Sequence, residues 1–182
     1  MTEEVLIFYH GTDAANVESI ETHGLRPRSA NNDVEGTWKG RSHPECVYLT
    51  NKLHVARGFA QRFDKGAVFE VTLTSDEALR ADDNFLWYRF LKEESVSFDQ
   101  CEELDTWNAL VATVPKDNRW KDSLKERELC SHHGAIPPSQ IKKVDESTRL
   151  TFSTLELNKA ADEVAEFLSP RKRACLKFNA KK

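Results

Sequence analysis

Residues 5–29 read VLIFYHGTDAANVESIETHGLRPRS, and this stretch decides the fold. Its first five residues are apolar, and most of them are β-branched or aromatic, which is typical of a buried strand. We expect this strand to end at His10-Gly11-Thr12, because a glycine between polar residues is typical of a turn. The stretch therefore begins with a strand over residues 5–9.

A helix is predicted directly after that strand. Thr12 or Asp13 can cap it, since their side-chain oxygens can accept hydrogen bonds from the first free backbone N–H groups. One helical face would carry Val17, Ile20 and His23, and Gly24 is placed to end the helix. The predicted unit is a strand followed at once by a short helix.

The same order of elements recurs further along the chain. Cys46–Thr50 (CVYLT) predicts a second strand, Asn51 is expected to cap a helix that runs to about Phe63, and residues 67–73 (AVFEVTL) alternate as a third strand. Residues 26–45 contain Pro, Gly, Asn and Ser without a hydrophobic period, which predicts a long loop. Loops of this length are uncommon in compact domains and are often functional.

The second half of the chain predicts further strands with helices between and after them. The expected elements are a loop at residues 80–84, an aromatic patch at Phe85, Trp87, Tyr88 and Phe90, a helix over residues 104–114, a strand over 127–132, a turn at 136–138, strands over 140–144 and 149–155, and a helix over 156–168. This order favours one α+β domain with a small, mostly antiparallel core. The domain would span residues 1–168, followed by a basic tail at 169–182.

Composition excludes several classes of protein. The 182 residues are 39% hydrophobic and 31% charged, which is typical of a soluble globular protein and not of a disordered, collagenous or membrane-spanning chain. The first twelve residues, MTEEVLIFYHGT, contain two acids and no basic segment, which favours a cytoplasmic protein with no membrane partner. The four cysteines form no CxxC pair, so neither a disulfide framework nor a metal site is expected.

Charge is distributed unevenly along the chain. The net charge is -4, yet all six charged residues after Pro170 are Lys or Arg, so the rest of the chain is more acidic than the total. An acidic body does not suit a protein that grips nucleic acid over a whole face. The tail could supply a local phosphate contact, or it could be a solvated terminus.

Three segments together carry a family resemblance. They are residues 8–29 (FYHGTDAANVESIETHGLRPRS), residues 47–63 (VYLTNKLHVARGFAQRF) and residues 67–73, with residues 127–144 as a fourth, looser match. In order and spacing they resemble the ADP-ribosyltransferases of the diphtheria toxin and poly(ADP-ribose) polymerase type, which carry a His-Tyr-Glu signature. The resemblance implies a small, split, mostly antiparallel sheet flanked by helices, with NAD as co-substrate.

The resemblance also implies a role for each matching residue. His10 would hydrogen-bond a ribose hydroxyl of NAD, and the backbone of Gly11 would pair with the nicotinamide carboxamide, assisted by the Thr12 hydroxyl. Tyr48 would stack on the nicotinamide ring, and Phe59, eleven residues further on in the following helix, would close its other face. Cleavage of the nicotinamide–ribose bond develops positive charge on the sugar, which a nearby carboxylate stabilises.

Two glutamates compete for the third signature position. Glu128 is preferred because it starts the apolar run Leu129-Cys130, whereas Glu126 lies between Lys125 and Arg127 and resembles a helix end. If one strand included both glutamates, the period of two would put them on the same face. Ordinary solvated charges are the alternative for both.

The long loop supplies candidate phosphate ligands. By resemblance it borders the NAD phosphates, and Arg26 or Arg28 could pair with the pyrophosphate because a guanidinium matches phosphate oxygens well. Trp38 on the same loop could stack on adenine or on an acceptor base, or anchor the loop.

The leading hypothesis is a mono-ADP-ribosyltransferase that moves ADP-ribose from NAD to a macromolecule. RNA or DNA is slightly favoured over protein as the acceptor, and a bacterial or phage toxin or effector, with an antitoxin or inhibitor as a further partner, fits a small single domain. One alternative is an NAD-dependent RNA 2′-phosphotransferase, which shares the fold, although the upstream Arg-His element of that family is missing. The other is a non-catalytic module that binds NAD or ADP-ribose.

Overall fold

A computed structural model of the chain describes residues 5–30, 42–94 and 104–144. Their strands form one six-stranded sheet in the order β4-β5-β2-β1-β3-β6, in which every neighbouring pair is antiparallel. The strands are β1 (Leu6–Asp13), β2 (Cys46–Thr50), β3 (Gly66–Leu73), β4 (Leu79–Ala81), β5 (Leu129–His133) and β6 (Ile141–Lys143). With the helices described next, this sheet confirms the α+β class.

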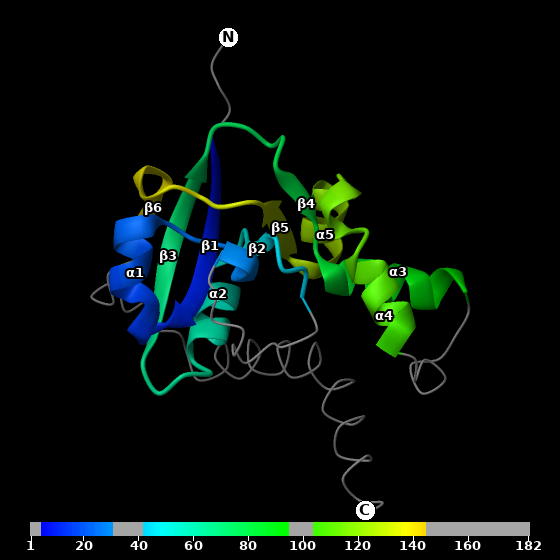
Figure 1. Cartoon of the computed structure of the whole chain (residues 1–182), viewed down its shortest axis with the longest axis horizontal. Helices are drawn as coiled ribbons and strands as arrows, with labels where there is room; N and C mark the ends of the chain where they lie inside the picture. The colour runs from blue at the N-terminus through cyan, green and yellow to red at the C-terminus, as the bar shows by residue number, and fades with distance from the viewer. Residues whose placement is uncertain (1–4, 31–41, 95–103, 145–182) are drawn as a thin grey trace, which may run out of the picture.

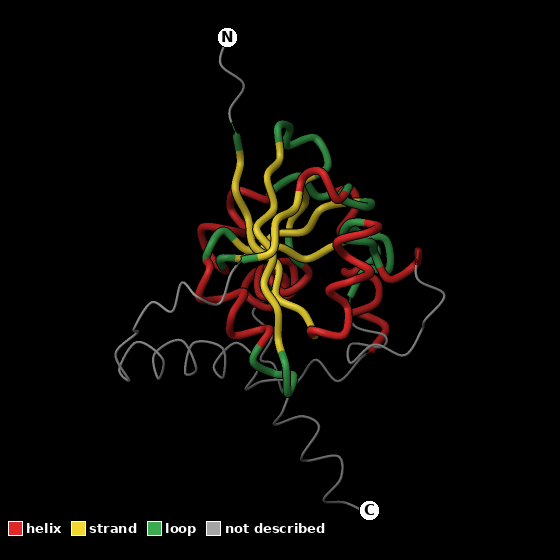
Figure 2. The backbone as a smooth tube through the Cα atoms, turned by 90° about the vertical axis from the view of Figure 1, so that its left-hand side faces the viewer, coloured by secondary structure: helices red, strands yellow, loops and turns green. Residues whose placement is uncertain are grey.

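Helices flank the sheet in two groups (Figures 1 and 2). The α-helices are α1 (Val17–His23), α2 (Leu53–Ala60), α3 (Asp83–Glu93), α4 (Leu104–Val111) and α5 (Trp120–Arg127). Figure 1 shows α1 and α2 beside β1 and β3, whereas α3, α4 and α5 gather at the β4 edge. No helix in the described ranges is both long enough and apolar enough to cross a membrane.

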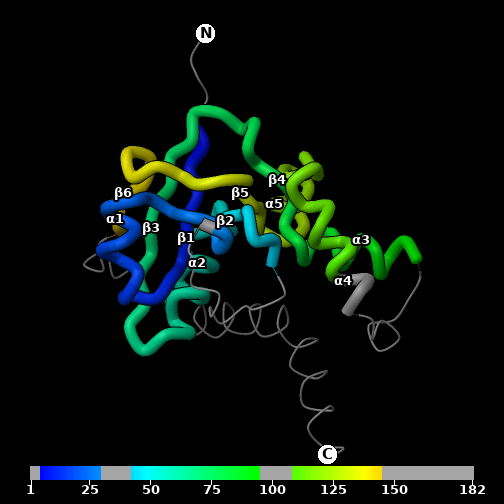
Figure 3. Tube along the Cα trace, viewed as in Figure 1, coloured from blue at the N-terminus to red at the C-terminus, as the bar shows by residue number. Residues whose placement is uncertain are grey.

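The two central strands of the sheet, β1 and β2, have the fewest paired residues of any neighbouring strands. β1 pairs with β3 along its whole length, from Leu6 to Asp13, and β2 pairs with all of β5. Between β1 and β2, by contrast, the register contains the single pair Tyr9↔Thr50. The sheet therefore has two halves, β4-β5-β2 and β1-β3-β6, and the 74–78 connection crosses from one half to the other (Figure 3).

The main hydrophobic core joins both halves of the sheet to α5 and α1. Phe8 of β1 and Leu49 of β2 are buried in it, and the Trp120 ring meets the Phe8 ring edge-on with 6.4 Å between centroids. Burying one such aromatic or aliphatic side chain contributes about 1.5 to 3 kcal/mol. This core holds the two central strands together where few backbone bonds do.

Two glycines let α2 approach the opposite side of β1 and β3. A Cβ atom on Gly11 would lie 1.9 Å from the carbonyl oxygen of Ala56, and one on Gly66 would lie 2.3 Å from that of Ala60. Both contacts are with backbone, so no side-chain rotation could relieve them. Gly11 is therefore required by the packing of α2 on the sheet.

Strand β1 is longer than its sequence pattern predicts. His10, Gly11 and Thr12 continue the ladder opposite Phe69, Val68 and Ala67, and Asp13 is the residue that caps the following turn. The prediction that the strand ends at His10-Gly11-Thr12 was wrong because the pairing partner, β3, is remote in sequence. The helix that ends at Gly24, which has φ 80°, is confirmed.

Several other boundaries also differ from the predictions. Asn51 does not cap α2, which begins after Lys52 without a side-chain cap and ends at Ala60. Residues 80–84 are not a loop, because β4 ends there and the Asp82 carboxylate caps α3. Arg127 and Glu128 precede β5 because α5 extends to Arg127. The strand predicted at 149–155, the helix at 156–168 and the tail at 169–182 lie outside the described residues.

Candidate functional site

His10 and Tyr48 meet where the two halves of the sheet diverge. Nδ1 of His10 lies 2.9 Å from the carbonyl oxygen of Tyr48, which joins β1 to β2 next to their single register pair. A carbonyl oxygen can only accept, so Nδ1 carries the proton and donates it. In the neutral ring, Nε2 is then left with a lone pair that can accept a hydrogen bond.

Burial keeps the His10 ring neutral. Desolvation lowers the pKa of His10 below its ordinary value of 6.5, and the hydrogen bond to Tyr48 offsets part of that effect. A neutral imidazole with its proton on Nδ1 is suited to accept a hydrogen bond from a hydroxyl group at Nε2. This is the protonation state required to bind a ribose hydroxyl as an acceptor.

The phenol of Tyr48 is anchored at the start of α3. Its oxygen accepts a hydrogen bond from the backbone N–H of His43 at 2.8 Å, and its hydroxyl faces Oδ2 of Asp83 at 3.5 Å. Burial, followed by the negative charge of Asp83, raises the pKa of Tyr48 well above its ordinary value. The Tyr48 hydroxyl therefore stays protonated, and the side chain packs against the hydrophobic cluster that contains Phe85.

Gly11 and Thr12 are engaged in the fold itself. Gly11 lies under α2, and the buried Thr12 hydroxyl accepts a hydrogen bond from the side-chain amide of Asn16 at 3.0 Å. Each residue thus has a structural role beside the NAD-binding role that the resemblance implies.

Glu128 occupies a strained junction between α5 and β5. Its φ of 56° and ψ of 16° lie in the left-handed region, and its N–H donates to the carbonyl of Leu124 as the helix ends. Thr50 at the end of β2 holds it there, because the Thr50 hydroxyl donates to the Glu128 carbonyl at 2.6 Å. Glycine is the residue that this C-terminal position favours, so a glutamate here is unusual and worth a functional explanation.

The Glu128 carboxylate faces α2 and an open hollow. Oε2 lies 3.9 Å from Nε2 of His54 in the first turn of α2, and Glu128 lines a hollow of about 360 Å³ together with residues of α5 and of the β2–α2 turn. Glu126 is engaged elsewhere, because it lies within α5 and pairs with Arg89 at 2.6 Å. Neither glutamate lies within β5, so the two do not share a strand face.

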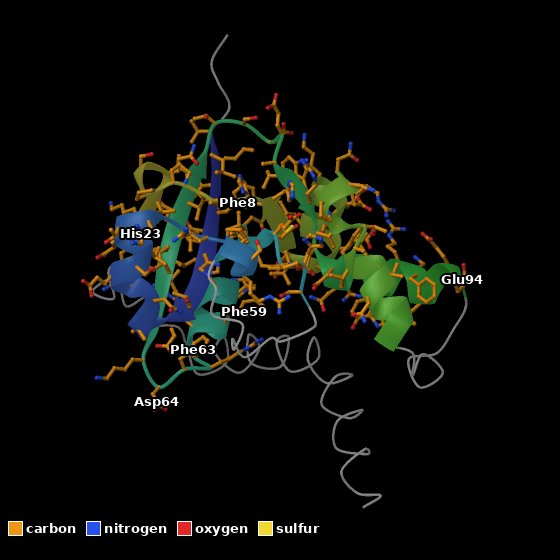
Figure 4. All side chains as sticks on the ribbon, viewed as in Figure 1. Phe8, His23, Phe59, Phe63, Asp64 and Glu94 are labelled. Carbon is orange, nitrogen blue, oxygen red and sulfur yellow. The ribbon has the colours of Figure 1, made fainter. Side chains whose placement is uncertain are left out.

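Phe59 lies on α2, one helical turn beyond the residue that contacts Gly11 (Figure 4). The guanidinium of Arg62 lies over its ring, 4.4 Å from the centroid. In this structure the Arg62 cation therefore covers one face of the Phe59 ring. The resemblance assigns that ring to stacking on the nicotinamide.

The two loop arginines have different surroundings. Arg26 is exposed, and Nη2 of Arg28 donates to the carbonyl of Ser42 at 3.0 Å, which ties together the two ends of the long loop. Residues 31–41 of that loop, including Trp38, lie outside the described residues.

The structure thus places the predicted site residues in two groups, one along α2 and one at the central strands. Helix α2 contacts Gly11 through Ala56, approaches Glu128 through His54 and carries Phe59, whereas His10 and Tyr48 contact each other at the central strands. Sequence reasoning missed His54 and Asp83, because no local pattern signals a contact with a residue so remote in the chain. In the described part of the chain, no group of three or more His, Cys, Asp or Glu side chains is arranged to hold a metal ion.

The comparisons with known proteins leave the family open. No family model matches the chain, and no curated protein matches it at a significant level. Among the solved structures it is similar to a chain called EcPltA, with a TM-score of 0.39 and 12% identity, over 74% of this chain and 71% of that one. A similarity this weak carries no argument about the site or its chemistry.

Proposed function

We propose that the chain is an NAD-dependent mono-ADP-ribosyltransferase that cleaves the nicotinamide–ribose bond and transfers ADP-ribose to a macromolecular acceptor. The observation that carries the proposal is the 2.9 Å contact between His10 Nδ1 and the Tyr48 carbonyl. It brings two of the three signature residues together at the divergence of the central strands and orients the neutral imidazole. His10 Nε2 is then free to accept a hydrogen bond from the ribose.

Glu128 is the carboxylate that we assign to the developing positive charge on the sugar. Its support is the left-handed backbone at residue 128, where glycine would cost less free energy. Strain at such positions often accompanies a functional side chain. NAD supplies the ADP-ribose and a leaving nicotinamide, and a fixed negative charge beside the sugar would lower the barrier to their separation.

Nicotinamide release from NAD, measured with purified protein, tests this function directly. RNA, DNA and cell lysate are offered as separate acceptors, and mass spectrometry identifies the acceptor that gains one ADP-ribose. We expect Glu128→Gln to reduce the rate at least tenfold while NAD still binds, because the amide keeps the shape and removes the charge; removal of one electrostatic group commonly costs about 100-fold or more.

Glu126→Gln is the matched control, since it makes the same chemical change two residues away. Glu126 lies in α5, and its carboxylate pairs with Arg89. It should retain the parent rate. Loss of activity in Glu126→Gln with full activity in Glu128→Gln would transfer the assignment to Glu126. NAD binding without release under any condition would instead favour a non-catalytic module.

A further inference from the structure

The hollow beside Glu128 is lined by three lysines among other residues. Lys52 enters it from the β2–α2 turn, and Lys121 and Lys125 enter it from α5. Trp120, Leu124 and Asn51 also line it, and Glu128 is the one acidic residue of the lining in the described part of the chain. This is a local positive site on a protein whose net charge is -4.

The three lysines form no salt bridge with a carboxylate in the described part of the chain. The salt bridges there engage Arg89, Arg119, His54 and His133, and none includes a lysine of the hollow. Lys121 instead lies over the ring of Trp120, with Nζ 5.1 Å from the centroid. These ammonium groups therefore remain available to an anionic ligand.

The two lysines of α5 lie about one turn apart on the same face of the helix. Lys121 lies in the first turn, where the helix dipole disfavours a cation, whereas Lys125 lies in the last turn, where the dipole favours one. Like charges four residues apart repel by a few tenths of a kcal/mol. An anionic ligand between the two ammonium groups would relieve that repulsion.

We propose that this hollow binds the phosphate backbone of a nucleic-acid acceptor and presents that strand to the site at Glu128. Lysines act as point charges toward phosphates without reading bases, and a positively charged groove is the usual way to follow the backbone of a single strand. The inference rests on the proposed function for the meaning of Glu128, and it names the acceptor class that the sequence favours only slightly.

Binding of a fluorescently labelled twelve-nucleotide single strand, followed by anisotropy without NAD, tests the proposal in the full chain. Its DNA and RNA forms are compared with Lys121→Gln/Lys125→Gln and with Lys142→Gln/Lys143→Gln, which removes the same charge from exposed positions on β6 at the opposite edge of the sheet. We expect the α5 pair to bind about tenfold more weakly and to flatten the slope of log affinity against log salt by about 1.4. The β6 pair should match the parent.

Three results would overturn the proposal. In the binding assay, the parent could fail to bind either strand, or both double variants could lose affinity equally because only net charge matters. In the nicotinamide-release assay, the KM for NAD could rise only in the α5 pair. The last result would assign the hollow to the pyrophosphate of NAD. Since the binding assay contains no NAD, a catalytically inactive protein leaves this test intact, and nicotinamide release without strand binding refutes only the acceptor site.

Discussion

Glu128 combines a strained backbone with an accessible carboxylate. The left-handed region costs a residue with a Cβ atom about 1 to 2 kcal/mol relative to glycine, which has no such atom. Thr50 and Leu124 hold the backbone of Glu128 in place through its carbonyl and its N–H, so the side chain contributes little to fixing that conformation. At the scale of a single residue, stability and the proposed function therefore favour different amino acids.

Replacement of Glu128 by glycine should separate these two effects. We expect Glu128→Gly to be no less stable than the parent, and up to about 1 kcal/mol more stable, because relief of strain exceeds the added entropy of the unfolded glycine. Its nicotinamide release should be lost. Chemical unfolding of the parent and the variant measures the first effect, and the NAD assay measures the second.

Glu126→Gly is the matched comparison, because it places glycine inside α5 and should cost about 1 kcal/mol. Equal destabilisation of the two variants would mean that the Glu128 side chain supports the fold, through His54, and the functional assignment would lose its main structural support.

At the scale of elements, the packing of α2 against the sheet positions residues of the proposed site. The helix touches β1 at Gly11 and β3 at Gly66, and it carries His54 toward Glu128. The hydrophobic contacts of Ala56 and Ala60 with Val68 complete this interface. Small residues on both surfaces make the close approach possible.

Gly11→Ala and Gly66→Ala should therefore destabilise the protein to a similar extent. An added methyl group would collide with a backbone carbonyl of α2 in either variant, at a cost of about 1 to 3 kcal/mol. For a chain of this size each kcal/mol lowers the melting temperature by roughly 2 to 4 °C. Thermal unfolding followed by circular dichroism measures both shifts.

Gly66 lies outside the proposed site, which makes it the reference for the packing effect alone. If Gly11→Ala retained the parent melting temperature, the close contact with Ala56 would be refuted.

At the scale of the whole molecule, half-buried histidines link folding to pH. Burial lowers the pKa values of His10, His43 and His132 below their ordinary value of 6.5. Between that value and the lower folded pKa, the unfolded chain binds more protons than the folded protein does. The contribution of these histidines to the free energy of unfolding is therefore largest above about pH 6.5 and falls as the pH decreases through this window.

His10→Asn should make this decrease shallower. The asparagine amide can still donate to the Tyr48 carbonyl from near the position of Nδ1, and it does not titrate, so its part of the acid sensitivity disappears. His43 and His132 should preserve the rest. Urea unfolding of the parent and the variant at pH 5, 6, 7 and 8 measures the difference; the two proteins would have parallel curves if His10 did not contribute.

Local patterns in the chain were sufficient for β2, which runs over Cys46–Thr50 as predicted, for most of β3 and for the helix that ends at Gly24. They succeed because alternation of side chains and a glycine with positive φ act over a few residues. The α+β class follows from the order of such elements. The candidate residues could also be named from sequence, through the family resemblance.

The extension of β1 through His10-Gly11-Thr12 depended instead on the pairing of β1 with β3. The start of β4 at Leu79 likewise depended on the pairing of β4 with β5. The contacts of His10 with Tyr48, of His54 with Glu128 and of Gly11 with Ala56 join residues far apart in the chain. So does the grouping of Lys52 with the lysines of α5. A local pattern carries no information about such neighbours, because they meet only when burial of the shared core brings their elements together.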